Sequence, residues 1–171
     1  MSMGLYDAII PTWLQMLGAG KVWLDKAAAS ELPEDKIAQA RLIEDMLPFA
    51  YQVKSMVVHS IGAIEGVRGG LFEPDRSDPP ETLQGMHSRI DAAIVGLEAV
   101  TRDELESFIG REMRFEVKQL GKRLDFTADQ FLLTFSQPNF FFHATTAYAI
   151  LRMKGVPIGK IDYLGQMRMI A

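Results

Sequence analysis

The chain has 171 residues, of which 48% are hydrophobic and 23% are charged, and its formal net charge is −4. This is the balance of an ordinary globular protein, and we expect residues 1–171 to form a single domain. The absence of cysteine excludes disulfide bonds, thiolate catalysis and cysteine-based zinc sites. Lysine and arginine are scattered through a net acidic chain, which argues against a nucleic-acid partner.

The N-terminal segment MSMGLYDAIIPTW lacks the basic start and the apolar run that mark a signal peptide. No apolar run reaches the ~20 residues that a membrane-spanning helix needs. From these two absences we expect a cytoplasmic protein without a membrane segment.

The first predicted helix covers residues 5–30, where apolar residues recur every three or four positions. Trp13 and Trp23 lie on a second apolar stripe of this helix, and core packing is the favoured interpretation of both. Pro11 suits the helix only if the helix effectively starts there, because the proline ring blocks a preceding turn. A short helix and a connection are expected over residues 34–46.

A second long helix is predicted over residues 48–68, and the glycines at 69–70 should end it. His59 shares one stripe of this helix with small residues such as Gly62 and Gly66. Small residues allow either a close helix neighbour or room for a ligand, and the sequence leaves both interpretations open.

Residues 71–80 contain three prolines and three acidic residues, which predicts a surface loop. The third helix is expected over residues 81–100, and its apolar stripe places His87 toward the core. Thr101 and Glu104 have the spacing of a capping box, which predicts a short turn of helix.

Residues 113–126 alternate between apolar and polar around Gly121, which predicts a two-stranded hairpin. A lone hairpin is marginally stable, so we expect it to lie against the helices. Thr127 should cap the fourth helix, and Pro138 should kink it and free a carbonyl about one turn earlier. The glycine and proline within residues 155–157 should end this helix.

The three histidines, His59, His87 and His143, fall on three different predicted helices. If sequential helices run up and down, a rise of ~1.5 Å per residue places the three at depths that agree within about one helical turn. Three imidazoles at one depth are a candidate site for a divalent metal with open positions for water or substrate. The alternative is three ordinary packed or half-exposed side chains, because no two form the i, i+4 pair typical of helical metal sites.

Asn139 and Phe140 share the mostly apolar stripe of His143, and burial should lower the pKa of this imidazole and keep it neutral. Tyr148 and Arg152 form an i, i+4 pair on another face of the same helix. We interpret Asn139, Phe140, Tyr148 and Arg152 as candidate pocket residues, the last two forming a polar rim for an anionic small molecule. A stacked pair on the surface is the alternative interpretation of Tyr148 and Arg152.

Two segments carry a resemblance to a known family. PNFFFHATTAYAILRMKGVPIGKIDYLG (residues 138–165) and QARLIEDMLPFAYQV (residues 39–53) resemble the signature blocks of a bacterial family labelled only as a domain of unknown function. That family is similar to the DinB/YfiT-like superfamily, and the expected hairpin lies between the two blocks.

The resemblance implies a mainly α fold: a DinB/YfiT-like four-helix bundle with a small β-hairpin before the last helix, often a homodimer. It also implies a divalent metal, nickel or zinc, held by one histidine on the second helix and a His-x-x-x-His pair on the fourth. His59 would be the first of these ligands and His143 one of the pair, with His87 as a third ligand that the superfamily pattern does not supply. The other position of the pair is Asn139 or Ala147, and there the sequence departs from the pattern.

Three functions follow as hypotheses. The first is a metal-dependent transferase or hydrolase that acts on a small molecule, as in the superfamily. The second is a metal-free protein that binds a small molecule in the bundle. The third is a structural dimer, because the wide apolar face of the first helix, with Trp13 and Trp23, exceeds what three partner helices cover.

Overall fold

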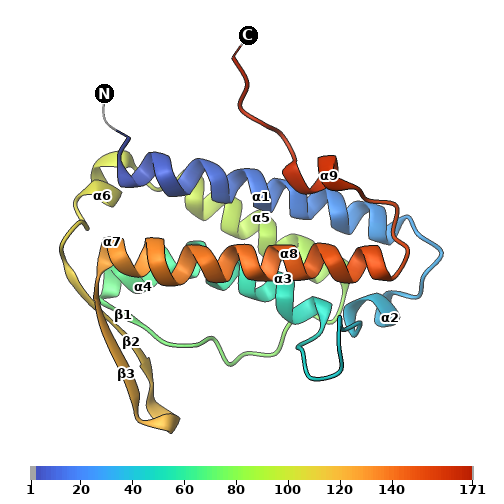
Figure 1. Cartoon of the computed structure of the whole chain (residues 1–171), viewed down its shortest axis with the longest axis horizontal. Helices are drawn as coiled ribbons and strands as arrows, with labels where there is room; N and C mark the ends of the chain where they lie inside the picture. Colours follow the sequence, from blue (N-terminus) through green and yellow to red (C-terminus); the bar gives the residue numbers. More distant parts are fainter. Residues whose placement is uncertain (1–2, 171) are drawn as a thin grey trace.

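The computed structural model describes residues 3–170, and Figure 1 shows long helices lying side by side with a hairpin that projects from one end. The helices are α1 (Leu5–Ala28), α2 (Glu34–Ala38), α3 (Phe49–Val58), α4 (Ile61–Gly69), α5 (Leu83–Glu98), α6 (Arg102–Glu106), α7 (Ala128–Gln130), α8 (Gln137–Met153) and α9 (Lys160–Leu164). A 3-10 turn, η1 (Lys118–Leu120), and a π-helical segment, η2 (Phe131–Ser136), accompany them. The strands are β1 (Leu71–Phe72), β2 (Glu112–Val117) and β3 (Lys122–Thr127). The fold is therefore mainly α with a small sheet, as predicted.

The long helices share one apolar core. α1 packs against α5 and α8, while α3 packs against α8 and α5. Most of the largest fully buried side chains come from these helices and from η2, and they include Trp13, Phe49, Met86, Phe131 and Phe140. Burying a large apolar side chain contributes about 1.5–3 kcal/mol, so side chains of this kind supply much of the energy that holds the helices together.

α1 runs through Pro11, and the prediction that the helix effectively starts there is wrong. The proline forfeits one helical hydrogen bond near the start of α1. Contacts from α6 hold the first turn instead. Arg102 donates two hydrogen bonds of 2.6 Å to the Asp7 carboxylate, and the N–H of Tyr6 donates to Oε1 of Glu106 at 3.0 Å.

The predicted second helix is broken into α3 and α4 at His59 and Ser60. Ser60 leaves helical geometry, with φ of −115° and ψ of −95°. Its hydroxyl donates to the carbonyl of Met56 at 2.7 Å, which satisfies a carbonyl near the break. Ser60 competes locally for backbone carbonyls, an effect that the continuous apolar stripe does not reveal, and the break places His59 at the C-terminal end of α3.

The predicted hairpin is confirmed, with β2 and β3 antiparallel from the pair Glu112 and Thr127 to the pair Val117 and Lys122. Gly121 at the turn has a φ of 58°, a left-handed conformation that glycine adopts without strain. The predicted loop also contains a strand, because β1 pairs in parallel with β2. Aromatic side chains of the sheet pack against η2, with Phe115 and Phe135 having ring centroids 4.9 Å apart, so the hairpin is docked as expected.

The last core helix departs from α geometry just before Pro138, where the kink was expected. The turn that precedes it forms the π-helical segment η2, and α8 starts at Gln137. The side-chain amide of Asn139 donates to the carbonyl of Phe135 at 2.7 Å, so a side chain replaces part of the interrupted backbone pattern. π-helical turns of this kind often occur at functional sites.

The C-terminal segment covers the apolar face of α1. Gly155 ends α8 with a φ of 85°, and α9 then crosses α1, as Figure 1 shows. Trp23 donates from Nε1 to the carbonyl of Asp162 at 2.8 Å and stacks on Tyr163 with centroids 5.7 Å apart. Trp13 and Trp23 are 0% and 1% exposed, so the expectation of an uncovered tryptophan face is wrong. A homodimer stays a prediction.

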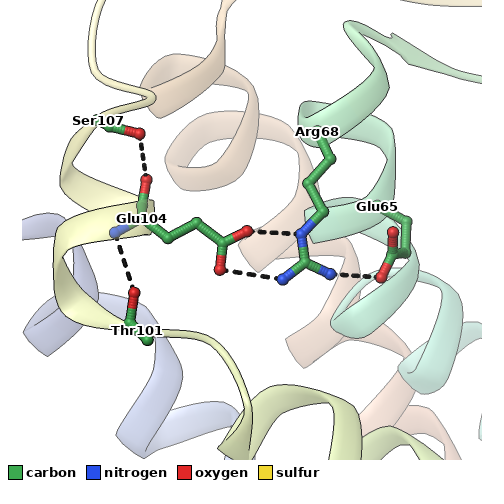
Figure 2. Close-up of polar contacts among 5 residues, drawn as sticks. All are labelled: Glu65, Arg68, Thr101, Glu104 and Ser107. Carbon is green, nitrogen blue, oxygen red and sulfur yellow. Dashed lines mark hydrogen bonds and ion pairs between the residues drawn. The ribbon is translucent and has the colours of Figure 1, made fainter.

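The short helix α6 is tied to α4 by a polar network, drawn in Figure 2. Thr101 caps α6 as predicted, its hydroxyl accepting from the N–H of Glu104 at 3.2 Å. The Glu104 carboxylate accepts from Nε and Nη2 of Arg68, at 2.7 and 3.0 Å. Arg68 also donates to Glu65 of its own helix at 2.5 Å. Its guanidinium therefore links α4 to α6 through Glu104 and is held in place by Glu65.

Within residues 3–170, none of the helices is long and apolar enough to cross a membrane.

Candidate functional site

Two of the three histidines meet where α3 ends and α8 passes it. The rings of His59 and His143 stack with centroids 5.7 Å apart and planes inclined by 13°. Phe135 of η2 lies edge-on to His59, and Tyr51 of α3 lies edge-on to His143. The break in α3–α4 and the π-helical turn therefore face each other across the imidazole pair.

His87 has other partners. Its Nδ1 lies 2.9 Å from Oδ2 of Asp91, and its Nε2 lies 3.6 Å from Oδ1 of Asp25. The side chain is 24% exposed, so the predicted core-facing position is wrong. Asp91 also pairs with Lys21 of α1, which makes His87 part of a polar seam between α1 and α5. The structure thus brings His59 and His143 together and gives His87 a separate environment.

The tautomer of His143 follows from its partner Gln52. The amide nitrogen of Gln52 donates to the carbonyl of Leu47 at 2.7 Å, so its oxygen is the atom that faces His143. That oxygen lies 2.7 Å from Nδ1 of His143 and can only accept. His143 therefore carries its proton on Nδ1, and its lone pair is on Nε2.

His59 is held in the same way by Ser136, the last residue of η2. The Ser136 hydroxyl lies 3.2 Å from the carbonyl of His59 and 3.4 Å from Nδ1 of the same residue. The carbonyl can only accept and is nearer, so this arrangement favours the hydroxyl proton on the carbonyl and a long contact from Nδ1–H to the hydroxyl oxygen. The lone pair of His59 is then also on Nε2.

Both imidazoles are neutral at physiological pH. Burial, together with the neighbouring His143, lowers the pKa of His59 from 6.5 to about 3. Burial lowers the pKa of His143 from 6.5 to about 4. Neither Nε2 takes part in a hydrogen bond among the described residues, and neither is a buried polar atom without a partner, so solvent reaches both.

A cavity of about 130 Å³ adjoins His59. Its lining comes from α3, from the loop after β1, from the hairpin and from η2, and the residues are Tyr51, Lys54, Ser55, Val58, His59, Phe72, Pro74, Asp75, Phe115 and Phe135. Three phenylalanines form an apolar wall, while His59 and two hydroxyl groups supply polar atoms. His143 lies against two of the lining residues, His59 and Tyr51.

Lys54 in this lining is 2% exposed, and the loop after β1 provides the partners of its ammonium group. It donates to the carbonyl of Asp75 at 2.8 Å and to the carbonyl of Ser77, and it lies 3.3 Å from Oδ1 of Asp75. These three oxygens surround the ammonium, and the Asp75 carboxylate balances its charge. Lys54 therefore fixes the loop after β1 beside the cavity, and its charge is already paired with a carboxylate.

The fold and the sequence both have known counterparts. The family described as "Domain of unknown function (DUF1993)" matches residues 5–164. The chain belongs to this family. The DUF1993 chain is also similar to the crystal structure of a DinB family member from Shewanella denitrificans, at 29% identity and a TM-score of 0.79, over 98% of this chain and 95% of that one. No match was found among curated proteins. The resemblance inferred from residues 39–53 and 138–165 is thereby confirmed.

The four residues expected to form a pocket in this DUF1993 chain have structural contacts instead. Asn139 bonds the η2 backbone, and Phe140 is 0% exposed with its ring 5.8 Å from that of Trp13. Tyr148 lies edge-on to Trp23 at 6.0 Å, and Arg152 donates to the carbonyl of Ile158 at 2.6 Å. None of the four lines the cavity beside His59, and their role in binding stays a prediction.

The residues that complete the site, Gln52, Ser136 and Lys54, were not singled out from the sequence. Gln52 and Lys54 are polar residues inside the apolar segment of α3, and both are 2% exposed. A polar residue at a buried helical position must have a partner, which is the signal that could have identified them. Ser136 shows no such pattern, because it depends on where the π-helical turn falls.

The DUF1993 site fits a metal ion only in part. Two imidazoles that share a tetrahedral ion have ring centroids ~5 Å apart, and the observed 5.7 Å is close to this. A catalytic zinc site needs three protein ligands. Over residues 3–170 no group of three or more histidine, cysteine, aspartate or glutamate side chains could hold a metal ion. The predicted three-histidine set is not assembled, and no reaction step can be derived through a metal here.

Proposed function

We propose that this DUF1993 chain binds a small molecule in the cavity beside His59, with the imidazole pair providing the polar contacts. The observation that supports this most is the pair itself: two neutral rings, each with Nδ1 held by a neighbour and Nε2 accessible. The aromatic walls and the fixed loop exclude water from one side of a bound molecule. This is the metal-free binding hypothesis, and a transferase or hydrolase activity would require a reacting group from the ligand or a partner molecule.

A screen of small ring compounds by two-dimensional amide NMR tests this proposal. We expect bound compounds to shift the resonances of cavity residues such as Val58, and His59→Phe, which fills the cavity, to abolish the shifts. His87→Gln is the matched control, because it removes a histidine outside the site, and it should bind as the parent does. Shifts confined to other parts of the chain, or none for any compound, would contradict the proposal.

A metal-dependent transferase or hydrolase is the second candidate. It is favoured by one observation, namely that each imidazole donates from Nδ1 to an oxygen atom, as metal-bound histidines usually do. His59 and His143 would be two ligands, and water or substrate would have to supply the others. We also propose that α1, α3 with α4, α5 and η2 with α8 correspond to the four helices of the DinB-like bundle.

Titration calorimetry of the metal-stripped protein with nickel and zinc tests the second candidate. Binding of one ion per chain that is lost in both His59→Ala and His143→Ala, and kept in His87→Ala, would support a two-imidazole site. Loss of metal binding in all three variants would instead support a site built from all three histidines. Absence of binding in the parent chain at millimolar metal would rule out this candidate.

A further inference from the structure

The polar groups of the site offer almost only acceptors to a ligand. Each imidazole carries its proton on Nδ1. In His143 this N–H donates to Gln52, and in His59 it faces the hydroxyl of Ser136. The accessible nitrogen of each ring is therefore a lone pair. A ligand that meets these nitrogens must bring its own hydrogen, because two acceptors cannot satisfy each other.

The remaining polar groups around the cavity agree with this. The ammonium of Lys54 donates to the carbonyls of Asp75 and Ser77 and is paired with the Asp75 carboxylate, so the charge of the one lysine in the lining is already balanced. Asp75 adds a carboxylate, an acceptor, to the same lining. The hydroxyls of Tyr51 and Ser55 can donate or accept, so neither opposes a ligand that donates.

The apolar walls set the size and the shape of the ligand. Phe72, Phe115 and Phe135 line the cavity, with their ring centroids between 4.9 and 6.5 Å apart. At about 130 Å³ the cavity is slightly smaller than the ~150 Å³ apolar cavity that accepts benzene in an engineered protein. A single five-membered ring, or an alkyl group of similar volume, matches this space.

We propose that the site selects small, neutral or cationic ring compounds that carry an N–H or O–H donor, and that it rejects anions of the same size. This inference depends on the proposed binding function and names the class of ligand for it. The Nε2 atom of His59, which lines the cavity, accepts the donor hydrogen, while the phenylalanine wall contacts the ring.

The test compares pyrrole, furan and propionate by amide NMR titration of the full chain in the presence of a chelator. Pyrrole and furan have nearly the same shape, but only pyrrole carries an N–H. One hydrogen bond to a neutral acceptor should make pyrrole bind about tenfold more tightly than furan. Propionate, an anion of comparable size, should cause no shift at the cavity residues.

The outcomes separate this inference from the function on which it rests. If furan binds as tightly as pyrrole, the cavity is a binding site but the donor rule is wrong. If propionate binds best, the assignment of the imidazoles as acceptors is wrong. If none of the three probes shifts the cavity residues at millimolar concentration, both the inference and the proposed small-ring binding fail.

The tautomers can be measured without any ligand. Long-range proton–nitrogen NMR of the histidine rings should show His59 and His143 protonated at Nδ1. Ser136→Ala should convert part of the His59 population to the other tautomer and reduce the preference for pyrrole. Thr146→Ala is the control, because Thr146 is a buried hydroxyl residue of α8 that does not line the cavity. A parent protein protonated at Nε2 of both rings would overturn the inference.

Discussion

At the scale of single residues, the chemistry of this protein depends on polar side chains placed inside an apolar core. Gln52 and Ser136 are 2% and 0% exposed, and each has an imidazole as a partner. Burying polar groups costs free energy unless each forms a hydrogen bond. The imidazoles add a further cost at low pH, because their charged forms lose hydration in the core.

The lowered pKa values of His59 and His143 predict acid sensitivity. Above pH 6.5 both rings are neutral in the folded and the unfolded chain, so they do not change stability. Below pH 6.5 the two imidazoles bind protons in the unfolded chain but stay neutral in the folded chain. The free energy of unfolding should then fall by up to about 1.4 kcal/mol per pH unit for each ring. This fall should continue to about pH 4 for His143 and about pH 3 for His59.

Urea unfolding between pH 7.5 and 5 measures this effect. The double variant His59→Gln/His143→Gln should show a clearly flatter pH dependence than the parent. The variant His87→Gln should keep the parental slope, since its ring lies outside the site. If the free energy of unfolding has the same pH dependence in the parent and the double variant, the pKa values of these two rings are not lowered in the folded state.

At the scale of elements, the site forms where two helices lose their regular geometry. α3 ends at His59, and η2 replaces the α-helical turn before Pro138. Ser136 of one irregular segment bonds the backbone and the ring of His59 in the other, so the two irregularities support each other. The loop after β1 closes the same region, because Lys54 of α3 holds it through two backbone carbonyls.

Replacing Lys54 by methionine should release that loop. The variant leaves the carbonyls of Asp75 and Ser77 without their partner, which should lower the free energy of unfolding by about 1–3 kcal/mol. Amide hydrogen exchange should increase over residues 73–79 and little elsewhere. Arg89→Met is the control. Arg89 is a partly exposed residue whose Nη2 lies 3.5 Å from Oδ2 of Asp75, and it contacts the side chain of the loop residue rather than its backbone. Unchanged exchange in Lys54→Met would show that the loop is held by its own packing.

At the scale of the whole molecule, the C-terminal segment completes the core. α9 lies across α1, and Gln15 of α1 donates to the carbonyl of Leu164 at 2.7 Å. Lys26 pairs with Asp162 at 2.6 Å, close to the hydrogen bond between Trp23 and the backbone of α9. α9 therefore covers this part of α1 within the single chain.

Removing residues 160–171 should expose Trp23. Without α9 the indole loses its hydrogen bond and its stacked partner Tyr163, so tryptophan fluorescence should move to longer wavelength and the melting temperature should fall. Removal of residues 166–171 alone is the matched control and should leave both values nearly unchanged, because Asp162 and Tyr163 remain. Identical fluorescence in the two truncated chains would mean that another segment covers the indole.

The sequence by itself determined the helical class, the hairpin around Gly121 and the family, because these depend on local spacing and on the two signature segments. It also placed His59 and His143 on helices that turned out to be neighbours. Only the tertiary structure decided that His87 lies apart and that Gln52 and Ser136 orient the other two rings. Those contacts join residues far apart in the chain, and they depend on the break at Ser60 and on the π-helical turn, neither of which the periodic spacing of apolar residues marks.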